Sequence, residues 1–156
     1  MRQFATFKLD EQVFGIDVLL VREINRHMDI TPVQLAPDYV RGLINLRGQI
    51  VTIFDLGVRL GLPPRSVTRD SHNIILKTDE ELTTISRREG REELKSSRDT
   101  AGLLVDEIGD IVEEEAAIEA PPANVGDTGA QFLSGVVKLE DGLVHILDVQ
   151  ESLRQG

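Results

Sequence analysis

An internal repeat is the feature that most constrains how this chain can fold. Residues 42–60 (GLINLRGQIVTIFDLGVRL) align without a gap with residues 135–153 (GVVKLEDGLVHILDVQESL), and six positions are identical. Several other positions keep their apolar character, such as Leu43 against Val136 and Phe54 against Leu147. Because identities and apolar pattern agree, the alignment indicates an internal duplication. The chain is therefore predicted to contain two similar small modules.

Each copy of the repeat has the pattern of a β-hairpin that runs into a short helix. In the first copy, Arg47-Gly48 separates two apolar arms, and a glycine readily adopts the positive φ of a tight hairpin turn. An aspartate follows the second arm in both copies, where its carboxylate is placed to cap the helix. The turn and cap residues expected in the two copies are Gly48, Asp55, Gly142 and Asp148.

The remainder of the chain adds further short strands. Apolar or alternating runs predict strands at 4–9, 13–16, 72–76, 102–105 and 108–112, and a helix capped by Asp17 is predicted over 17–25. We also expect an acidic helical turn at 113–119 and a loop at 121–130. About ten short strands with brief helices favour small β-barrels over a βαβ sheet. The predicted fold is mostly β, with two barrels of about five strands each.

The predicted barrels share one domain that spans residues 1–156. We place the first barrel approximately at 14–77 and the second at 1–13 plus 78–150. Residues 78–100 are treated as an insertion, because they are highly charged and almost without large apolar side chains. Three interpretations stay open for this insertion: a mobile loop, a solvated hairpin, or a short helix held by i,i+4 charge pairs.

Composition excludes several classes of function. The net charge of −10 argues against nucleic acids and anionic membranes as partners, since both bind clustered cations. The chain has no cysteine, so disulfides, thiol catalysis and thiolate metal sites are excluded. The N-terminus lacks the apolar segment of a secretory signal, and no apolar run is long enough to span a bilayer. We therefore expect a soluble, cytoplasmic protein.

Catalytic and metal-binding patterns find little support in the sequence. The three histidines, His27, His72 and His145, are scattered and lack metal-ligand spacing. The acids around Asp106 and Asp110 lack the order of a calcium-binding loop, and phosphate-loop and serine-hydrolase motifs are absent. We predict no metal and no cofactor. A hydrolase using Asp106 or Asp110 is the enzymatic alternative, and two carboxylates converging in a cleft would favour it.

Several segments together resemble one protein family. The sequence Asn45-Leu46-Arg47-Gly48, inside VRGLINLRGQIVTIFDL, is similar to the central signature of CheW-type coupling proteins of bacterial chemotaxis. Matching segments follow in the expected order at 14–24, 30–33, 102–112 and 132–149. The resemblance covers nearly the whole chain, and this ordered combination is specific. The insertion at 78–100 is longer than the family pattern implies.

The resemblance implies a fold and a function. The fold is two intertwined five-stranded SH3-like barrels, in which the first strand helps to complete the second barrel. The function is that of a non-enzymatic adaptor between the cytoplasmic tip of methyl-accepting chemotaxis receptors and the regulatory domain of a CheA-type histidine kinase. Such an adaptor is cytoplasmic and is recruited to membrane-associated receptor arrays. The alternative within the family is an adaptor of a pilus or other non-flagellar pathway.

Arg47 is the first candidate contact residue. On sequence alone it fits a solvated turn residue, whereas the resemblance implies a guanidinium that holds two carbonyls or a carboxylate of a partner. A receptor tip needs an apolar groove, although the same apolar residues also fit a plain core. The expected receptor contacts are Val21, Ile24, Arg47, Val105, Ile108 and Val112. The expected kinase contacts are Arg41, Gly42, Asn45 and Ile53, although Asn45 also fits a role in the turn and Gly42 fits a bulge.

Overall fold

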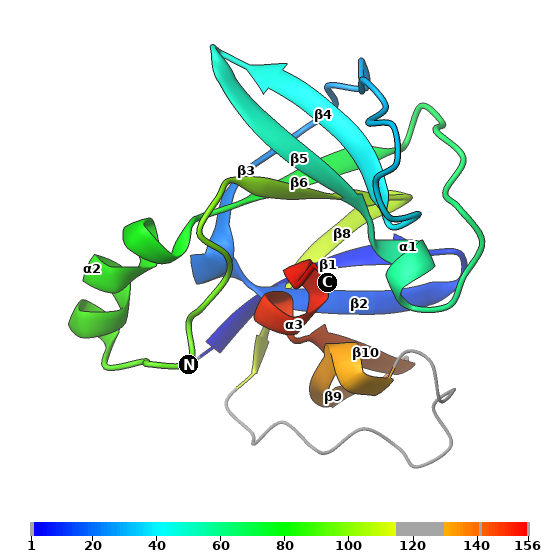
Figure 1. Cartoon of the computed structure of the whole chain (residues 1–156). Coiled ribbons are helices and arrows are strands. Elements are labelled where there is room, and N and C mark those ends of the chain that lie inside the picture. Colours follow the sequence, from blue (N-terminus) through cyan, green and yellow to red (C-terminus); the bar gives the residue numbers. More distant parts are fainter. Residues whose placement is uncertain (1, 115–129, 141, 156) are drawn as a thin grey trace.

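Ten strands form two five-stranded sheets in the computed structural model, which describes residues 2–114, 130–140 and 142–155 (Figure 1). Sheet A has the order β8 (Glu107–Glu114), β1 (Arg2–Leu9), β2 (Gln12–Asp17), β10 (Gly142–Leu147), β9 (Leu133–Leu139). Sheet B has the order β3 (Val21–Asn25), β6 (His72–Leu76), β7 (Ala101–Val105), β5 (Gln49–Asp55), β4 (Val40–Leu46). The mostly β, SH3-like prediction is confirmed, and β1 belongs to the same sheet as the second copy of the repeat, as the family resemblance implied.

The sheets divide the chain at different residues from the predicted barrel limits. Strand β2 belongs to sheet A, because it forms an antiparallel hairpin with β1. Strand β7 belongs to sheet B, because it lies between β6 and β5 and runs parallel to β5. Sheet B therefore takes its strands from residues 21–105, and sheet A takes strands from both ends of the chain.

The two copies of the repeat occupy equivalent places in the two sheets. The first forms β4, β5 and helix α1 (Leu56–Arg59), and the second forms β9, β10 and helix α3 (Val149–Leu153). In each copy the second hairpin arm pairs in parallel with a strand from elsewhere in the chain, β5 with β7 and β10 with β2. Asp55 accepts a hydrogen bond from Val58 N at 3.3 Å, and Asp148 accepts one from Glu151 N at 3.1 Å. Both aspartates therefore cap their helices.

The structure describes both turn residues of the first hairpin but only one of the two expected in the second. In the first, Arg47 and Gly48 have φ values of 52° and 87°, which both lie in the left-handed region. In the second, Gly142 has φ 145°, and its expected turn partner at position 141 lies outside the described residues. The acidic turn predicted at 113–119 and the loop predicted at 121–130 also fall largely outside them, although residues 113 and 114 belong to β8.

The helix predicted over 17–25 is wrong beyond its first turn. Asp17 accepts a hydrogen bond from Leu19 N at 3.0 Å, but the helical segment is only the 3-10 turn η1 (Val18–Leu20). Strand β3 follows and pairs with β6, where Ile24 lies opposite Ile74. Sheet pairing of a β-branched segment therefore overrides a helical spacing of apolar residues.

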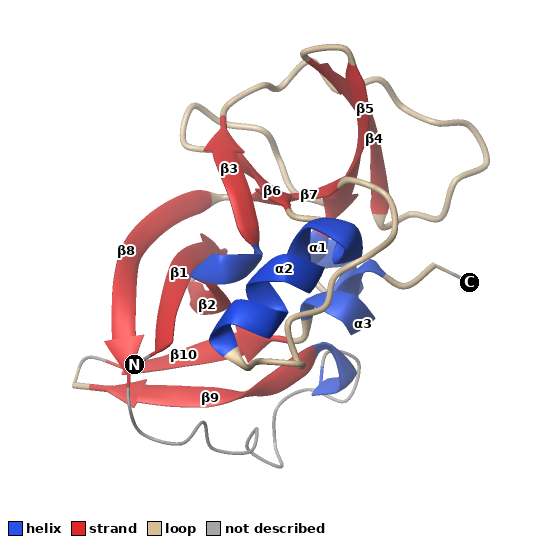
Figure 2. Cartoon of the chain, turned by 90° about the vertical axis from the view of Figure 1, so that its left-hand side faces the viewer, coloured by secondary structure: helices blue, strands red, loops and turns tan. Residues whose placement is uncertain are grey.

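The insertion at 78–100 contains a helix, which was one of the three open interpretations. Helix α2 (Asp79–Glu89) begins with a reciprocal capping box between Thr78 and Glu81 and ends at Gly90 in the left-handed conformation. Leu82 is 1% exposed, and Leu94, which follows the helix, is 4% exposed. Figure 2 shows α2 as a layer outside the strands. Packing onto the core therefore holds this charged segment in place.

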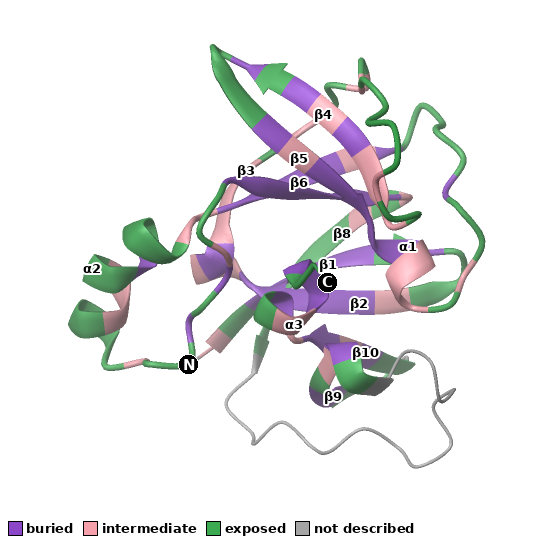
Figure 3. Cartoon of the chain, viewed as in Figure 1, coloured by how far each residue is buried: buried purple, intermediate pink, exposed green. Residues whose placement is uncertain are grey.

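One large core cluster joins the two sheets. It contains buried side chains from sheet A, such as Phe7, and from sheet B, such as Phe54, together with Leu82 of α2. A smaller cluster lies within each sheet, one around Ile53 and one around Val144. Figure 3 shows the buried residues concentrated on the strands. Because the largest cluster is shared, the two sheets are expected to fold as one unit.

Candidate functional site

The β4–β5 turn presents an exposed arginine on a fixed backbone. Asn45 accepts a hydrogen bond from Gly48 N at 2.9 Å, so its side chain supports the turn. The side chain of Arg47 is 70% exposed and forms an ion pair with Glu23 of β3. A guanidinium has five N–H donors, so most of its hydrogen-bonding capacity stays available to a partner.

Side-chain and backbone contacts join the β4–β5 hairpin to β3 and to the segment that follows β3. Strands β3 and β4 are the edges, and the ion pair of Arg47 with Glu23 joins them at the hairpin tip. Arg22 of β3 also donates to Gln49 Oε1 of β5 at 3.0 Å. The backbone of Thr31 exchanges two hydrogen bonds with Leu43, each 2.8 Å long. The hairpin tip is therefore held against β3 before any partner arrives.

The electrostatics of the tip favour the ion pair between Arg47 and Glu23. The hydrogen bond from Arg47 lowers the pKa of Glu23 below its usual value of 4.5, against the opposing effect of burial. Glu23 is therefore ionised at neutral pH and forms an ion pair with the charged Arg47. Sequence analysis missed Glu23, because a helix was expected over this segment. A strand predicted over 21–25 would not by itself have identified Glu23 either, because its partner Arg47 lies 24 residues away in the sequence.

The expected receptor contacts differ in how accessible they are. Ile24 is 39% exposed and follows Glu23 in β3. Val21 and Ile108 are half-buried against the shared core cluster, and Val112 is half-buried on β8. Val105 is fully buried, and a side chain without exposed surface cannot reach a partner. We therefore remove Val105 from the expected receptor contacts. Ile24 and Arg47 are the accessible members of the set.

Two of the expected kinase contacts are also buried. Ile53 is fully buried in the core of sheet B. Gly42 has φ 152°, and a Cβ there would overlap the carbonyl oxygen of Thr31. Both are therefore corrected to structural residues, and the close backbone approach at Gly42 comes from the chain itself. Arg41 is half-buried and donates to the carbonyl oxygen of residue 65 at 2.6 Å, which leaves Asn45 as the exposed member.

A buried arginine, missed by sequence analysis, occupies the centre of an acidic region. The side chain of Arg65 is 4% exposed, and its Nη1 lies 2.9 Å from both Asp10 Oδ1 and Asp106 Oδ2. Burial opposes its charge, but these two carboxylates outweigh that effect and raise the pKa of Arg65. Asp106 therefore serves an ion pair, and this arrangement gives no support to a pair of catalytic acids. No group of metal-ligating side chains is found among the described residues.

Comparisons with known proteins agree on one family. A profile of the CheW-like domain matches residues 3–156. The Chemotaxis protein CheW of Treponema pallidum (strain Nichols) is 31% identical over 150 residues, which cover 96% of this chain and 80% of that protein. The chain belongs to the CheW-like domain family. The Chemotaxis protein CheW of Rhizobium meliloti (strain 1021) is 30% identical, over 95% of this chain and 84% of that protein.

A solved CheW structure extends the match to three dimensions. The crystal structure of the scaffolding protein TtCheW from Thermoanaerobacter tengcongensis superposes with a TM-score of 0.78 at 27% identity. It covers 99% of this chain and 89% of the crystallised chain, so both sheets are included in the match. Among the described residues, no helix of this CheW-like chain has the length and apolar character needed to cross a membrane.

Proposed function

We propose that this chain is a non-enzymatic adaptor that couples chemotaxis receptors to a CheA-type histidine kinase. The observation that carries the proposal is the match of the whole CheW-like domain, in sequence and in both sheets, to chemotaxis and scaffolding proteins. The site geometry supports it, because the best-defined exposed feature is a rigid turn suited to binding and not to proton transfer. The adaptor would act in the cytoplasm at membrane-associated receptor arrays.

The receptor contact is proposed at the hairpin tip and β3. A receptor tip presents helices, and a docking surface for helices combines apolar side chains with a few directed polar groups. Ile24 offers the exposed apolar side chain, and Arg47, paired with Glu23, offers donors to carbonyl or carboxylate oxygens. Val21, Ile108 and Val112 stay proposed receptor contacts, since each is partly exposed.

The kinase contact is proposed on the β4–β5 hairpin. Asn45 and Ile50 lie directly opposite each other in the two arms, and Ile50 is 57% exposed. An exposed isoleucine next to a polar edge residue is typical of a protein interface with an apolar centre and polar rim. The regulatory domain of the kinase would pack on this part of the hairpin.

A binding experiment with matched arginine variants tests the receptor contact. We expect Arg47→Ala to weaken binding of a receptor-tip fragment about tenfold or more, as measured by isothermal titration calorimetry. Arg47→Lys should also bind more weakly, because an ammonium lacks the planar donor pair. Glu23→Gln should give an intermediate loss, since Arg47 would keep its charge but lose its charged partner.

Arg154→Ala is the control for this experiment. Arg154 is an exposed arginine that follows the second copy of the repeat and forms an ion pair with Glu151 of α3. The variant should bind the receptor fragment like the wild-type protein. Arg47 contributes an exposed ion pair, so its loss should change the thermal midpoint little. Wild-type affinity in a folded Arg47→Ala protein would contradict the proposed contact.

A further inference from the structure

A bulge in β3 allows two consecutive side chains to contact the β4–β5 hairpin. The register of β3 with β6 shifts between Val21 and Glu23, so Arg22 is an extra residue in the strand. Consecutive side chains of a regular strand point to opposite faces, whereas a bulge changes the direction of a side chain. Here Glu23 forms its ion pair with Arg47, and Arg22 donates to Gln49 Oε1 at 3.0 Å. Both side chains of β3 therefore contact the same hairpin tip.

Gln49 connects Arg22 to the proposed kinase surface. It begins β5, directly before the exposed Ile50, and its side-chain amide donates to Thr100 Oγ1 at 2.9 Å. Ile50 lines the same cavity of about 500 Å³ as Arg22 and Gln49, so these polar contacts lie next to the exposed isoleucine. Because Gln49 and Ile50 are consecutive in the strand, a displacement of the first moves the second.

The insertion at 78–100 contacts Arg22 and Gln49 from both of its ends. Glu81 of α2 forms an ion pair with Arg22, and the same carboxylate accepts a hydrogen bond from Thr78 N at 3.0 Å. At the other end of the insertion, Thr100 is 6% exposed and accepts the hydrogen bond from Gln49. The hydrogen bond from Arg22 lowers the pKa of Glu81 below its usual value of 4.5, against the opposing effect of burial. Glu81 is therefore ionised at neutral pH and pairs with a charged Arg22.

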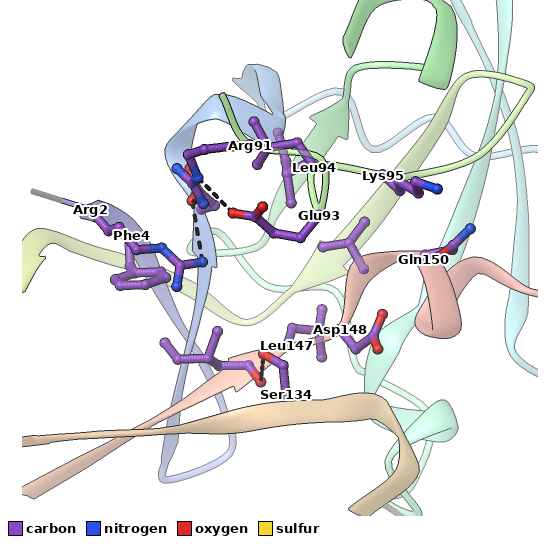
Figure 4. Close-up of a pocket in the computed structure, with 14 residues that line it drawn as sticks. Arg2, Phe4, Arg91, Glu93, Leu94, Lys95, Ser134, Leu147, Asp148 and Gln150 are labelled. Carbon is purple, nitrogen blue, oxygen red and sulfur yellow. Dashed lines mark hydrogen bonds and ion pairs between the residues drawn. The ribbon is translucent and has the colours of Figure 1, made fainter. Parts of the chain in front are cut away.

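Other contacts anchor the insertion to the rest of the protein. Leu82 and Leu94 are buried in the core cluster that both sheets share. Arg91, drawn in Figure 4, forms an ion pair with Asp17 at the end of β2. The first turn of α2 therefore has a fixed position that does not depend on its contact with β3.

We propose that Arg22 is a positioning residue for the kinase contact, and that the α2 insertion sets the strength of this contact through Arg22. The inference rests on the proposed function, because the contact it regulates is the kinase surface around Ile50. Arg22 acts by holding Gln49, and with it the start of β5, in one place. A partner that packs on an ordered strand loses less conformational entropy on binding, so this contact raises affinity.

Glu81→Gln and Glu80→Gln form a matched pair of variants for the test. Each removes one acid from the first turn of α2, so their effects on the helix dipole are similar. A glutamine at position 81 keeps the capping box with Thr78 but removes the charge that pairs with Arg22. Glu80 is exposed and forms no ion pair with another described residue.

Isothermal titration calorimetry of the full chain with an isolated kinase regulatory domain measures the effect on binding. We expect Glu81→Gln to bind about threefold more weakly than the wild-type protein, and Arg22→Gln about tenfold more weakly. Glu80→Gln should bind like the wild type. The difference between Glu81→Gln and the wild type should shrink at high salt, because the ion pair is partly exposed. Equal losses in Glu81→Gln and Glu80→Gln would overturn the proposal.

Combined variants test whether the effect passes through Arg22. Glu81 and Gln49 each contact Arg22, but no hydrogen bond joins them to each other in the described part of the chain. Glu81→Gln together with Gln49→Ala should therefore weaken binding less than the product of the two single effects. In the Arg22→Gln protein, Glu81→Gln should have no further effect. Independent effects in either combination would contradict a route through Arg22.

NMR spectra of the free protein separate this proposal from the adaptor function. Glu81→Gln should shift the amide resonances of Gln49 and Ile50, and Glu80→Gln should leave both in place. Absence of these shifts, or shifts without a loss of kinase affinity, would overturn the positioning role. A wild-type protein that binds no kinase domain would instead contradict the adaptor function, while the amide shifts would still show whether the insertion positions the hairpin.

Discussion

A single glycine determines how closely the segment before β4 packs on this strand. Gly42 has φ 152°, and a Cβ at this position would overlap the Thr31 carbonyl oxygen, which accepts a hydrogen bond from Leu43 N. We expect Gly42→Ala to lower the free energy of unfolding by about 2 kcal/mol or more, because strain and steric overlap add. Chemical denaturation measures this change.

Gly48→Ala is the comparison for that variant. Gly48 also has a positive φ, 87°, but a Cβ there would meet nothing within 4 Å. Its substitution should cost about 1 kcal/mol from backbone strain alone. Equal losses for the two variants would show that the overlap with Thr31 does not contribute.

His145 predicts a pH dependence of stability. Burial lowers the pKa of His145 below 6.5, and its ring lies 5.5 Å from that of Phe14, with Nδ1 lacking a described partner. Below pH 6.5 the unfolded chain therefore binds a proton more readily than the folded chain. Stability contributed by the neutral ring is present above pH 6.5 and is lost as pH falls through that value towards the folded pKa.

Thermal unfolding between pH 5 and pH 7.5 measures this effect. His145→Gln should make the decline in midpoint at acidic pH shallower than in the wild-type protein. His27→Gln alters an exposed histidine and serves as the control, with a decline like that of the wild type. An unchanged decline in His145→Gln would assign the acid sensitivity to other groups.

At the scale of single residues, the sequence predicted turn and cap residues better than it predicted ion pairs between distant residues. The turn of Arg47 and Gly48 and the caps at Asp55 and Asp148 follow from local chemistry, which short motifs encode. Glu23 and Arg65 were missed because their partners lie far away in sequence. Burial of Val105, Gly42 and Ile53 likewise depends on tertiary packing.

At the scale of elements, α2 is stabilised by its caps and by two buried leucines, Leu82 in the helix and Leu94 just after it. Leu82 is the one fully buried residue of the helix, and it packs into the cluster shared by both sheets. We expect Leu82→Ala to lower the free energy of unfolding by about 2–4 kcal/mol through the cavity it leaves. Thr84→Ala, an exposed change in the same helix, should be nearly neutral, and a similar loss in both variants would contradict this account.

The elements also show where pattern alone fails. The repeat predicted the hairpins β4–β5 and β9–β10 and the helices α1 and α3 that follow them, because hairpins and caps are local structures. The segment over β3 combines apolar residues at helical spacing with β-branched side chains, and pairing with β6 decides between them. For α2, composition left three interpretations open, and burial of two leucines in the core selects the helix.

At the scale of the whole molecule, two sheets that each contain one copy of the hairpin–helix unit share a core. The chain passes from sheet A to sheet B through η1 and returns between β7 and β8 (Figure 1). One cluster of apolar side chains spans both sheets, so their relative orientation is fixed by packing. A fixed orientation suits an adaptor whose proposed contacts lie on both sheets, with β3 and the β4–β5 hairpin in sheet B and Ile108 and Val112 on β8 of sheet A.

The central claim is that this molecule binds a receptor tip and a kinase regulatory domain at once. The most direct test is sedimentation velocity of the purified chain with an isolated CheA-type regulatory domain and a receptor-tip fragment from the same organism. Wild-type protein should form both binary complexes and a ternary complex, and Ile24→Asp should lose the receptor while keeping the kinase domain. Failure of a folded wild-type protein to bind either partner would contradict the account.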